Sequence, residues 1–110
     1  MAAAERKLVV DMFPALAKEL QQLLAERCEP QLAAQVQGLT VVGRCRCGDD
    51  FCGTFYVLPK LNGAYGPGHR NVALEPRQGM LILDVLDDKI AAVEVLYRED
   101  IRQRLLTEFP

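Results

Sequence analysis

Two apolar runs on either side of Asp87-Asp88-Lys89 constrain the fold of this chain more than any other feature. The first run covers residues 80–86 and the second covers residues 90–97. Both are rich in residue types that favour strands, and aspartate is common in the tight turns that close such pairs. Each run is apolar on both faces when it is read with a period of two. The pattern therefore predicts a β-hairpin that is buried on both sides.

The N-terminal third of the chain has the spacing of helices. Apolar residues recur every three or four positions from Val9 to Leu24, which predicts a main helix over about 12–27 after a short helix over about 3–10. Pro30 favours the start of another short helix, and Gly38 is a natural end for it. Cys28 lies at the junction before Pro30, where we expect a small buried side chain.

The period changes at Leu39, where β-branched residues begin. We predict strands over 39–47 and 51–58, with Pro59 ending the second strand. Residues 59–79 are rich in glycine and proline and predict a long loop, in which only 72–74 favour a short edge strand. A final helix is expected after Tyr97, because its acidic residues come first and its arginines later.

These elements predict a single α+β domain over residues 1–110. Helices (1–38) pack on an antiparallel sheet of about four strands (39–97), and a short C-terminal helix (98–110) follows. Because both faces of the hairpin are apolar, we expect one face to be covered by the helices. The other face needs the remaining elements of the chain or a second subunit to cover it, and we expect a symmetric homodimer formed through the sheet.

Composition and charge exclude several classes of protein. The formal net charge of the 110 residues is -2, which provides no strong field for nucleic acid. We find no run of about 18 apolar residues that predicts a membrane span, and no signal-peptide core near Met1. We therefore expect a cytoplasmic protein that binds neither nucleic acid nor membranes.

Three of the four cysteines gather between Arg44 and Cys52, where the residues Gly48-Asp49-Asp50-Phe51 separate Cys47 from Cys52. If the two neighbouring strands pair around this four-residue loop, the two cysteines face each other. Cys45, two positions earlier, then lies on the same strand face as Cys47. The only histidine of the chain belongs to the long loop, and over the thiols it would complete a Cys3His set that suits zinc. The candidate zinc ligands are Cys45, Cys47, Cys52 and His69.

Other interpretations of the thiols stay open at this point. Cysteines of a reducing compartment are mostly thiols or metal ligands, and these three suit small apolar positions beside a turn that needs Gly48. A disulfide or redox pair between Cys47 and Cys52 is a second interpretation. A third is a thiol nucleophile, Cys47 or Cys52, that His69 activates.

The long loop contains a candidate binding segment. Tyr65, His69 and Arg70 offer an aromatic ring and two basic groups to an anion or a peptide. The glycines around them match no phosphate-binding pattern. The carboxylates of Asp84, Asp87 and Asp88 are interpreted as turn and edge residues of the hairpin, where aspartate is common.

The run Val42-Gly43-Arg44-Cys45-Arg46-Cys47-Gly48, followed by Cys52 and Thr54, resembles a pattern in small uncharacterised bacterial proteins. Those proteins also have N-terminal helices, a Cys-x-Cys-Gly strand and a later hairpin, and the resemblance covers about half of the chain. It implies a bacterial cytoplasmic origin. No activity comes with it, so it assigns no functional residue.

The function expected from the sequence is that of a non-enzymatic interaction or regulatory domain. We expect it to form a homodimer, to bind a protein partner and to need no cofactor. The first alternative is a zinc-binding module that uses Cys45, Cys47 and Cys52. The second alternative is a thiol-dependent enzyme.

Overall fold

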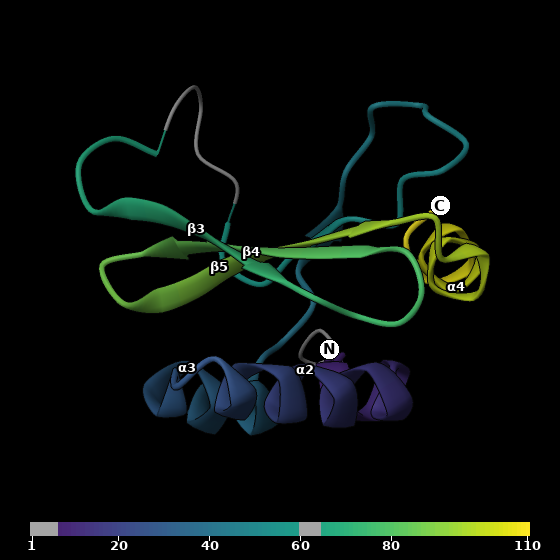
Figure 1. Ribbon diagram of the computed structural model, residues 1–110. Helices are drawn as coiled ribbons and strands as arrows, with labels where there is room; N and C mark the ends of the chain where they lie inside the picture. Colours follow the sequence, from purple (N-terminus) through teal and green to yellow (C-terminus); the bar gives the residue numbers. More distant parts are fainter. Residues whose placement is uncertain (1–6, 60–64) are drawn as a thin grey trace.

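The computed structural model describes residues 7–59 and 65–110 and places helices on one face of a five-stranded antiparallel sheet (Figure 1). The expected α+β architecture is confirmed, with one strand more than the four or so that were expected. No helix in the described ranges is long and apolar enough to cross a membrane. The helices are α1 (Val9–Met12), α2 (Pro14–Glu26), α3 (Pro30–Gln35), the 3-10 helix η1 (Val36–Gly38) and α4 (Glu99–Glu108). The strands are β1 (Gly43–Arg44), β2 (Phe55–Tyr56), β3 (His69–Leu74), β4 (Met80–Leu86) and β5 (Lys89–Leu96).

The predicted hairpin is β4–β5, and it forms the middle of the sheet, whose strand order is β1-β2-β5-β4-β3. Leu86 pairs with Lys89 across a two-residue turn. Asp87 and Asp88 in that turn have φ angles of 50° and 65°, and this left-handed pair matches the twist of a hairpin. Gln35 holds the turn against the helix layer, since its side chain donates to the Asp88 carbonyl (2.6 Å) and accepts from the Ile90 N–H (2.9 Å).

The hydrophobic core lies between the sheet and the helices α2 and α3, which run beneath it in Figure 1. Phe55 at its centre is fully buried, and its ring stacks on that of Phe13 with centroids 5.5 Å apart. Burial of this apolar surface is the main force that holds the two layers together. The fully buried large side chains also include Leu20, Leu24, Leu32, Leu81, Leu83, Ile90 and Leu105.

A β-bulge interrupts the β4–β5 ladder. Asp84 pairs with Ala92 but Val85 pairs with Ile90, so Ala91 is the extra residue. The Ala91 carbonyl accepts the backbone N–H groups of Val57 (2.9 Å) and Leu58 (3.1 Å). The bulge therefore fixes the place at which the chain leaves β2.

Two predictions about the strands were wrong. The strand expected over 39–47 is only the two residues of β1, because residues 39–41 pair with the start of the chain instead of with β2: Leu8 bridges Thr40, and Val9 N–H donates to the Leu39 carbonyl at 2.9 Å. The second expected strand, 51–58, shortens to β2, and the residues on either side of β2 make only isolated contacts with β5, such as the Cys52–Leu96 bridge and the Gly53 N–H to Val95 carbonyl bond (2.7 Å). The edge strand expected over 72–74 is present as β3, but it begins earlier, at His69, and shortens the loop expected over 59–79.

The helical part starts differently from the prediction. The main helix, expected from about residue 12, begins at Pro14, where a missing N–H costs nothing, and residues 9–12 form the separate short helix α1. Part of the helix expected over 3–10 lies outside the described residues. Cys28 is exposed, and not buried as expected, because it leaves the end of α2 with a left-handed φ of 59°.

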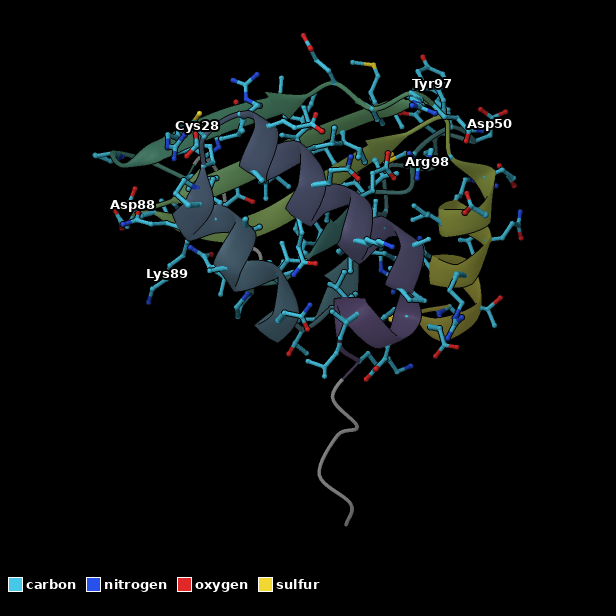
Figure 2. The ribbon with its side chains drawn as sticks, turned by 60° about the horizontal axis from the view of Figure 1, so that its bottom comes forward. Cys28, Asp50, Asp88, Lys89, Tyr97 and Arg98 are labelled. Atoms are coloured by element: carbon cyan, nitrogen blue, oxygen red, sulfur yellow. The ribbon has the colours of Figure 1, made fainter. Side chains whose placement is uncertain are left out.

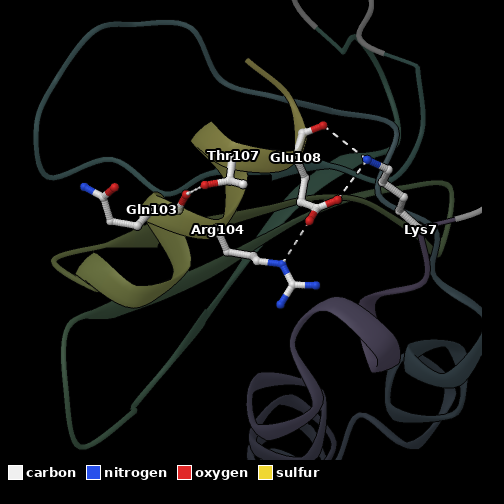
Figure 3. Close-up of polar contacts among 5 residues, drawn as sticks. All are labelled: Lys7, Gln103, Arg104, Thr107 and Glu108. Carbon is white, nitrogen blue, oxygen red and sulfur yellow. Dashed lines mark hydrogen bonds and ion pairs between the residues drawn. The ribbon is translucent and has the colours of Figure 1, made fainter.

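The C-terminal helix α4 is tied to the beginning of the described chain (Figure 3). Lys7 Nζ lies 3.0 Å from Glu108 Oε1 and 3.2 Å from the Glu108 carbonyl oxygen. Arg104 Nε approaches the other carboxylate oxygen at 3.4 Å. Ile101 and Leu105 bury the inner side of α4, so this helix closes the end of the core.

Truncating Phe55 to alanine should destabilise the protein by about 3–5 kcal/mol, because it leaves a cavity at the centre of the core. The free energy of unfolding from urea titration is the measurement. Val42→Ala is the control: this side chain is 48% exposed, and its loss should change stability by less than about 0.5 kcal/mol. Equal effects of the two variants would contradict the placement of Phe55.

Candidate metal centre

The short ladder between β1 and β2 positions the cysteines. Gly43 pairs with Tyr56 and Arg44 with Phe55, and the Cys45 N–H donates to the Thr54 carbonyl at 2.9 Å. The same antiparallel register, continued by two residues, sets Cys47 opposite Cys52, as the sequence predicted. Cys52 also bridges Leu96, so it continues the register of β2 against β5.

The three thiols are close enough to share one metal ion. The sulfur atoms of Cys45, Cys47 and Cys52 all lie within 4.8 Å of one another. Zinc–sulfur bonds of about 2.3 Å in a tetrahedron set sulfur atoms about 3.8 Å apart, so shifts of about 1 Å complete the geometry. Cys47 is exposed and the other two are half-buried, which leaves an open path to the site.

Hydrogen-bond donors point at two of the sulfurs. Gly48 has a φ of 84°, and this left-handed turn brings the Asp49 N–H back to the Cys47 sulfur. The Thr54 N–H and hydroxyl are directed at the Cys52 sulfur in the same way. The Thr54 hydroxyl oxygen accepts the Val95 N–H at 3.2 Å, which leaves its own proton for the sulfur. Such donors stabilise thiolates, the form in which cysteine binds metal.

The thiols influence each other's protonation. Burial disfavours ionisation of Cys52, but the donors of Thr54 and the neighbouring thiols outweigh it, so the pKa of Cys52 is lowered. The Asp49 N–H acts to lower the pKa of Cys47, but the bond with Cys52, burial and the nearness of Cys45 raise it to about 11. Of these two thiols, Cys52 is therefore the one whose ionised form is favoured by its surroundings.

Tyr56 borders the thiols on the same face of the sheet. Burial raises the pKa of its phenol to about 12, and the neighbouring Cys45 and Cys52 contribute to that shift. A phenol with this pKa stays protonated at neutral pH. It can therefore donate a hydrogen bond to a Cys45 thiolate.

The structure does not bring His69 to the thiols. It starts β3, and both β4 and β5 lie between β3 and β2 in the sheet. His69 Nε2 lies 2.9 Å from Asp84 Oδ1, and its ring stacks on Tyr65 with centroids 4.6 Å apart. The expectation that this loop folds over the cysteines was wrong, because residues 69–74 pair with β4 as an edge strand.

The expected binding segment is also divided. Tyr65 and His69 stack together, but Arg70 donates twice to the Glu29 carboxylate, at 3.0 and 3.1 Å. Successive residues of a strand point to opposite faces, so Arg70 lies on the helix side of the sheet and His69 on the other. The three residues therefore form no common site.

A buried carboxylate pair was missed from the sequence. Asp84, interpreted there as a turn or edge residue, is only 7% exposed and accepts from both His69 and Asn71 (2.6 Å) at Oδ1. Burial and the adjacent Asp84 raise the pKa of Glu94 to about 7, against a smaller opposing effect of His69. The signal available in the sequence was a single acidic residue inside each apolar run of the hairpin.

Comparisons of the chain with protein-family models, with curated proteins and with solved structures find no match. The resemblance to small bacterial proteins therefore stays a prediction. The chemistry of the site has to be inferred from its own residues.

Glu94→Gln should remove a pH dependence of stability. The pKa of Glu94 is about 7 in the folded state and has the ordinary value of 4.5 in the unfolded chain, so the folded state binds this proton more tightly. The resulting contribution to the free energy of unfolding is full below about pH 4.5 and is lost as the pH rises through about 7. Urea unfolding between about pH 5 and 8 should show a decrease in wild-type stability that the variant lacks. The exposed carboxylate of Glu75 provides the control, since Glu75→Gln should keep the wild-type slope.

Proposed function

We propose that this chain is a zinc-binding module in which Cys45, Cys47 and Cys52 supply three thiolate ligands. The observation that carries the proposal is the approach of three sulfur atoms within 4.8 Å, from two segments held in register by β1 and β2. Asp49 and Thr54 supply outer hydrogen bonds, which orient metal ligands in proteins.

The ligand type favours zinc over the hard cations. Thiolates select soft or borderline metals, whereas calcium and magnesium require oxygen ligands. Three thiolates carry one more negative charge than a divalent cation neutralises. Arg44 and Arg46 alternate with the cysteines along the segment, and their guanidinium groups donate to the carbonyls of Phe109 and Pro110. In the described part of the chain, no further histidine, cysteine or carboxylate joins this group. The fourth ligand is then water or a group from another molecule.

The role proposed for the metal is structural and not catalytic. The segment between β1 and β2 rises on the side of the sheet away from α2 and α3 (Figure 1). It has only the two-residue strands at its base, so a metal that joins Cys45 and Cys47 to Cys52 would stabilise it outright. A nucleophile of the cysteine–histidine type loses its support, because the only histidine pairs with Asp84.

An interaction or regulatory role, with a homodimer through the sheet, remains part of the proposal. The sheet face away from the helices carries Met80, which is 44% exposed, and the half-buried Ile82, Leu86 and Leu96. Apolar residues of this kind suit contact with a second subunit. Light scattering at micromolar concentration tests it, and a monomeric mass would remove the homodimer from the proposal.

Protein purified without chelator should contain about one zinc ion per chain by elemental analysis. Each of three variants should abolish stoichiometric zinc binding: Cys45→Ser, Cys47→Ser and Cys52→Ser. The reason is that the two remaining thiolates bind the ion less tightly than three. Cys28→Ser is the matched control and should keep the zinc, since Cys28 is exposed beyond the end of α2. Thr54→Val should weaken zinc affinity by about 10–100-fold through loss of its hydrogen bond to Cys52.

Thiol titration gives an independent check on the same samples. Four thiols should react after chelation, and only Cys28 should react rapidly while zinc is bound. Four rapidly reacting thiols in protein without metal, together with failure to take up added zinc or cobalt, would rule out the module.

A further inference from the structure

Two exposed aromatic rings meet at one corner of the molecule. Phe51 and Tyr97 stack with centroids 5.2 Å apart and planes 21° apart, although they are 37% and 60% exposed. The Tyr97 N–H donates to the Phe51 carbonyl at 2.9 Å, so the backbone holds the two residues together. Figure 2 shows Tyr97 beside Asp50 at the end of the sheet. The pair presents a ring surface to solvent instead of to the core.

The backbone at Tyr97 is strained. Its φ is 62°, a left-handed conformation that is uncommon for residues with bulky side chains. Asparagine or glycine would adopt it more easily. Strain of this kind persists where the surrounding structure enforces it, and it is concentrated at functional positions. The tyrosine ring is therefore kept at this corner against a local preference for a smaller residue.

Acidic residues flank both members of the aromatic pair in the sequence. Four exposed acidic residues lie within three positions of Phe51 or Tyr97. The nearest cation, Arg98, is turned toward the helices: its guanidinium lies 2.7 Å from Glu19 and donates to the Gln78 carbonyl at 3.0 Å. Arg102 neutralises part of this charge through Glu99 (3.2 Å). The four carboxylates belong to Asp49, Asp50, Glu99 and Asp100.

We infer that this aromatic corner, formed by Phe51 and Tyr97 with its acidic rim, is the docking site for a basic segment of a protein partner. A guanidinium stacks on aromatic faces, and its charge complements the neighbouring carboxylates. A second copy of this chain fits less well here, since two acidic rims would meet. Nucleic acid is repelled by the same charges. The inference goes beyond the zinc module and rests on different contacts.

Isothermal titration at low salt with capped hexa-arginine, hexa-lysine and hexa-glutamate peptides tests this inference. Hexa-arginine should bind more tightly than hexa-lysine, and hexa-glutamate should not bind. Phe51→Ala and Tyr97→Ala should each weaken hexa-arginine binding by about three- to thirtyfold, the range of a cation–π contact. Val42→Ala removes an exposed apolar side chain elsewhere and should leave binding unchanged. Absence of hexa-arginine binding would overturn the inference.

Two double variants that remove the same charge distinguish docking at the aromatic corner from non-specific attraction of the peptide to acidic residues. Asp49→Asn with Asp50→Asn should weaken binding, whereas Asp87→Asn with Asp88→Asn, in the turn at the other end of β5, should not. Equal weakening by both pairs would show non-specific attraction and would contradict a defined site. Zinc content measured on the same variants distinguishes loss of the metal module from loss of docking. A lower mass of Tyr97→Ala in light scattering would instead assign the corner to a second copy of the chain.

Tyr97→Asn decides whether the ring has a structural role. Asparagine accepts the left-handed backbone, so the urea midpoint should stay the same or rise while hexa-arginine binding weakens as much as in Tyr97→Ala. A clearly lower midpoint would mean that the stacked ring supports the fold, and it would overturn the inference.

Discussion

Burial of β5 in the middle of the sheet is the constraint on which the rest of the structure depends. This strand lies between β2 and β4, and Val93 at its centre is fully buried beside Leu83 on one side and Phe55 on the other. A strand this apolar is stable only inside a sheet that has layers above and below it. The helices supply one layer. The segment between β1 and β2, which rises on the opposite side, contributes to the other (Figure 1).

The proposed metal centre follows from this arrangement. β2 is only two residues long, yet its pairing with β5 fixes where Phe51, Cys52 and Thr54 lie. The thiols of Cys45 and Cys47 are then brought to Cys52 by the ladder of β1. The centre is thus positioned by the central strand of the sheet, although it occupies a segment with few backbone contacts of its own. Such a segment responds readily to a ligand, because little local structure has to be displaced.

Sequence periodicity predicted those elements whose burial is local, and it failed where a distant partner decided the pairing. The hairpin of β4 and β5 and the three-thiol cluster followed from spacing alone, since a period of two and a short loop determine both. The strand predicted over 39–47 includes residues 39–41, because nothing in the local sequence reveals that these residues pair with residues 7–9. His69 was placed over the cysteines for the same reason: its position depends on β3 pairing with β4. The Asp84–Glu94 pair could not be predicted, because it depends on the register between β4 and β5, and the structural preferences of single residues do not determine that register.

The bulge at Ala91 has a consequence for how the chain tolerates changes in length. On its C-terminal side Val93 and Val95 point to the core, while on its N-terminal side Ile90 does, so the alternation of inward and outward residues reverses phase at this one position. Deleting Ala91 would leave Ile90 opposite Val85 and set Ala92 directly after it opposite Asp84, so the ladder would become regular and the same side chains would face the core. The deletion would instead remove the carbonyl that binds the Val57 and Leu58 N–H groups at the end of β2. A deletion between Ala92 and Leu96 removes no spare residue, and it would turn the side chains on one side of the gap to the wrong face. Natural variation in this hairpin should therefore tolerate a single-residue gap at Ala91 but not between Ala92 and Leu96.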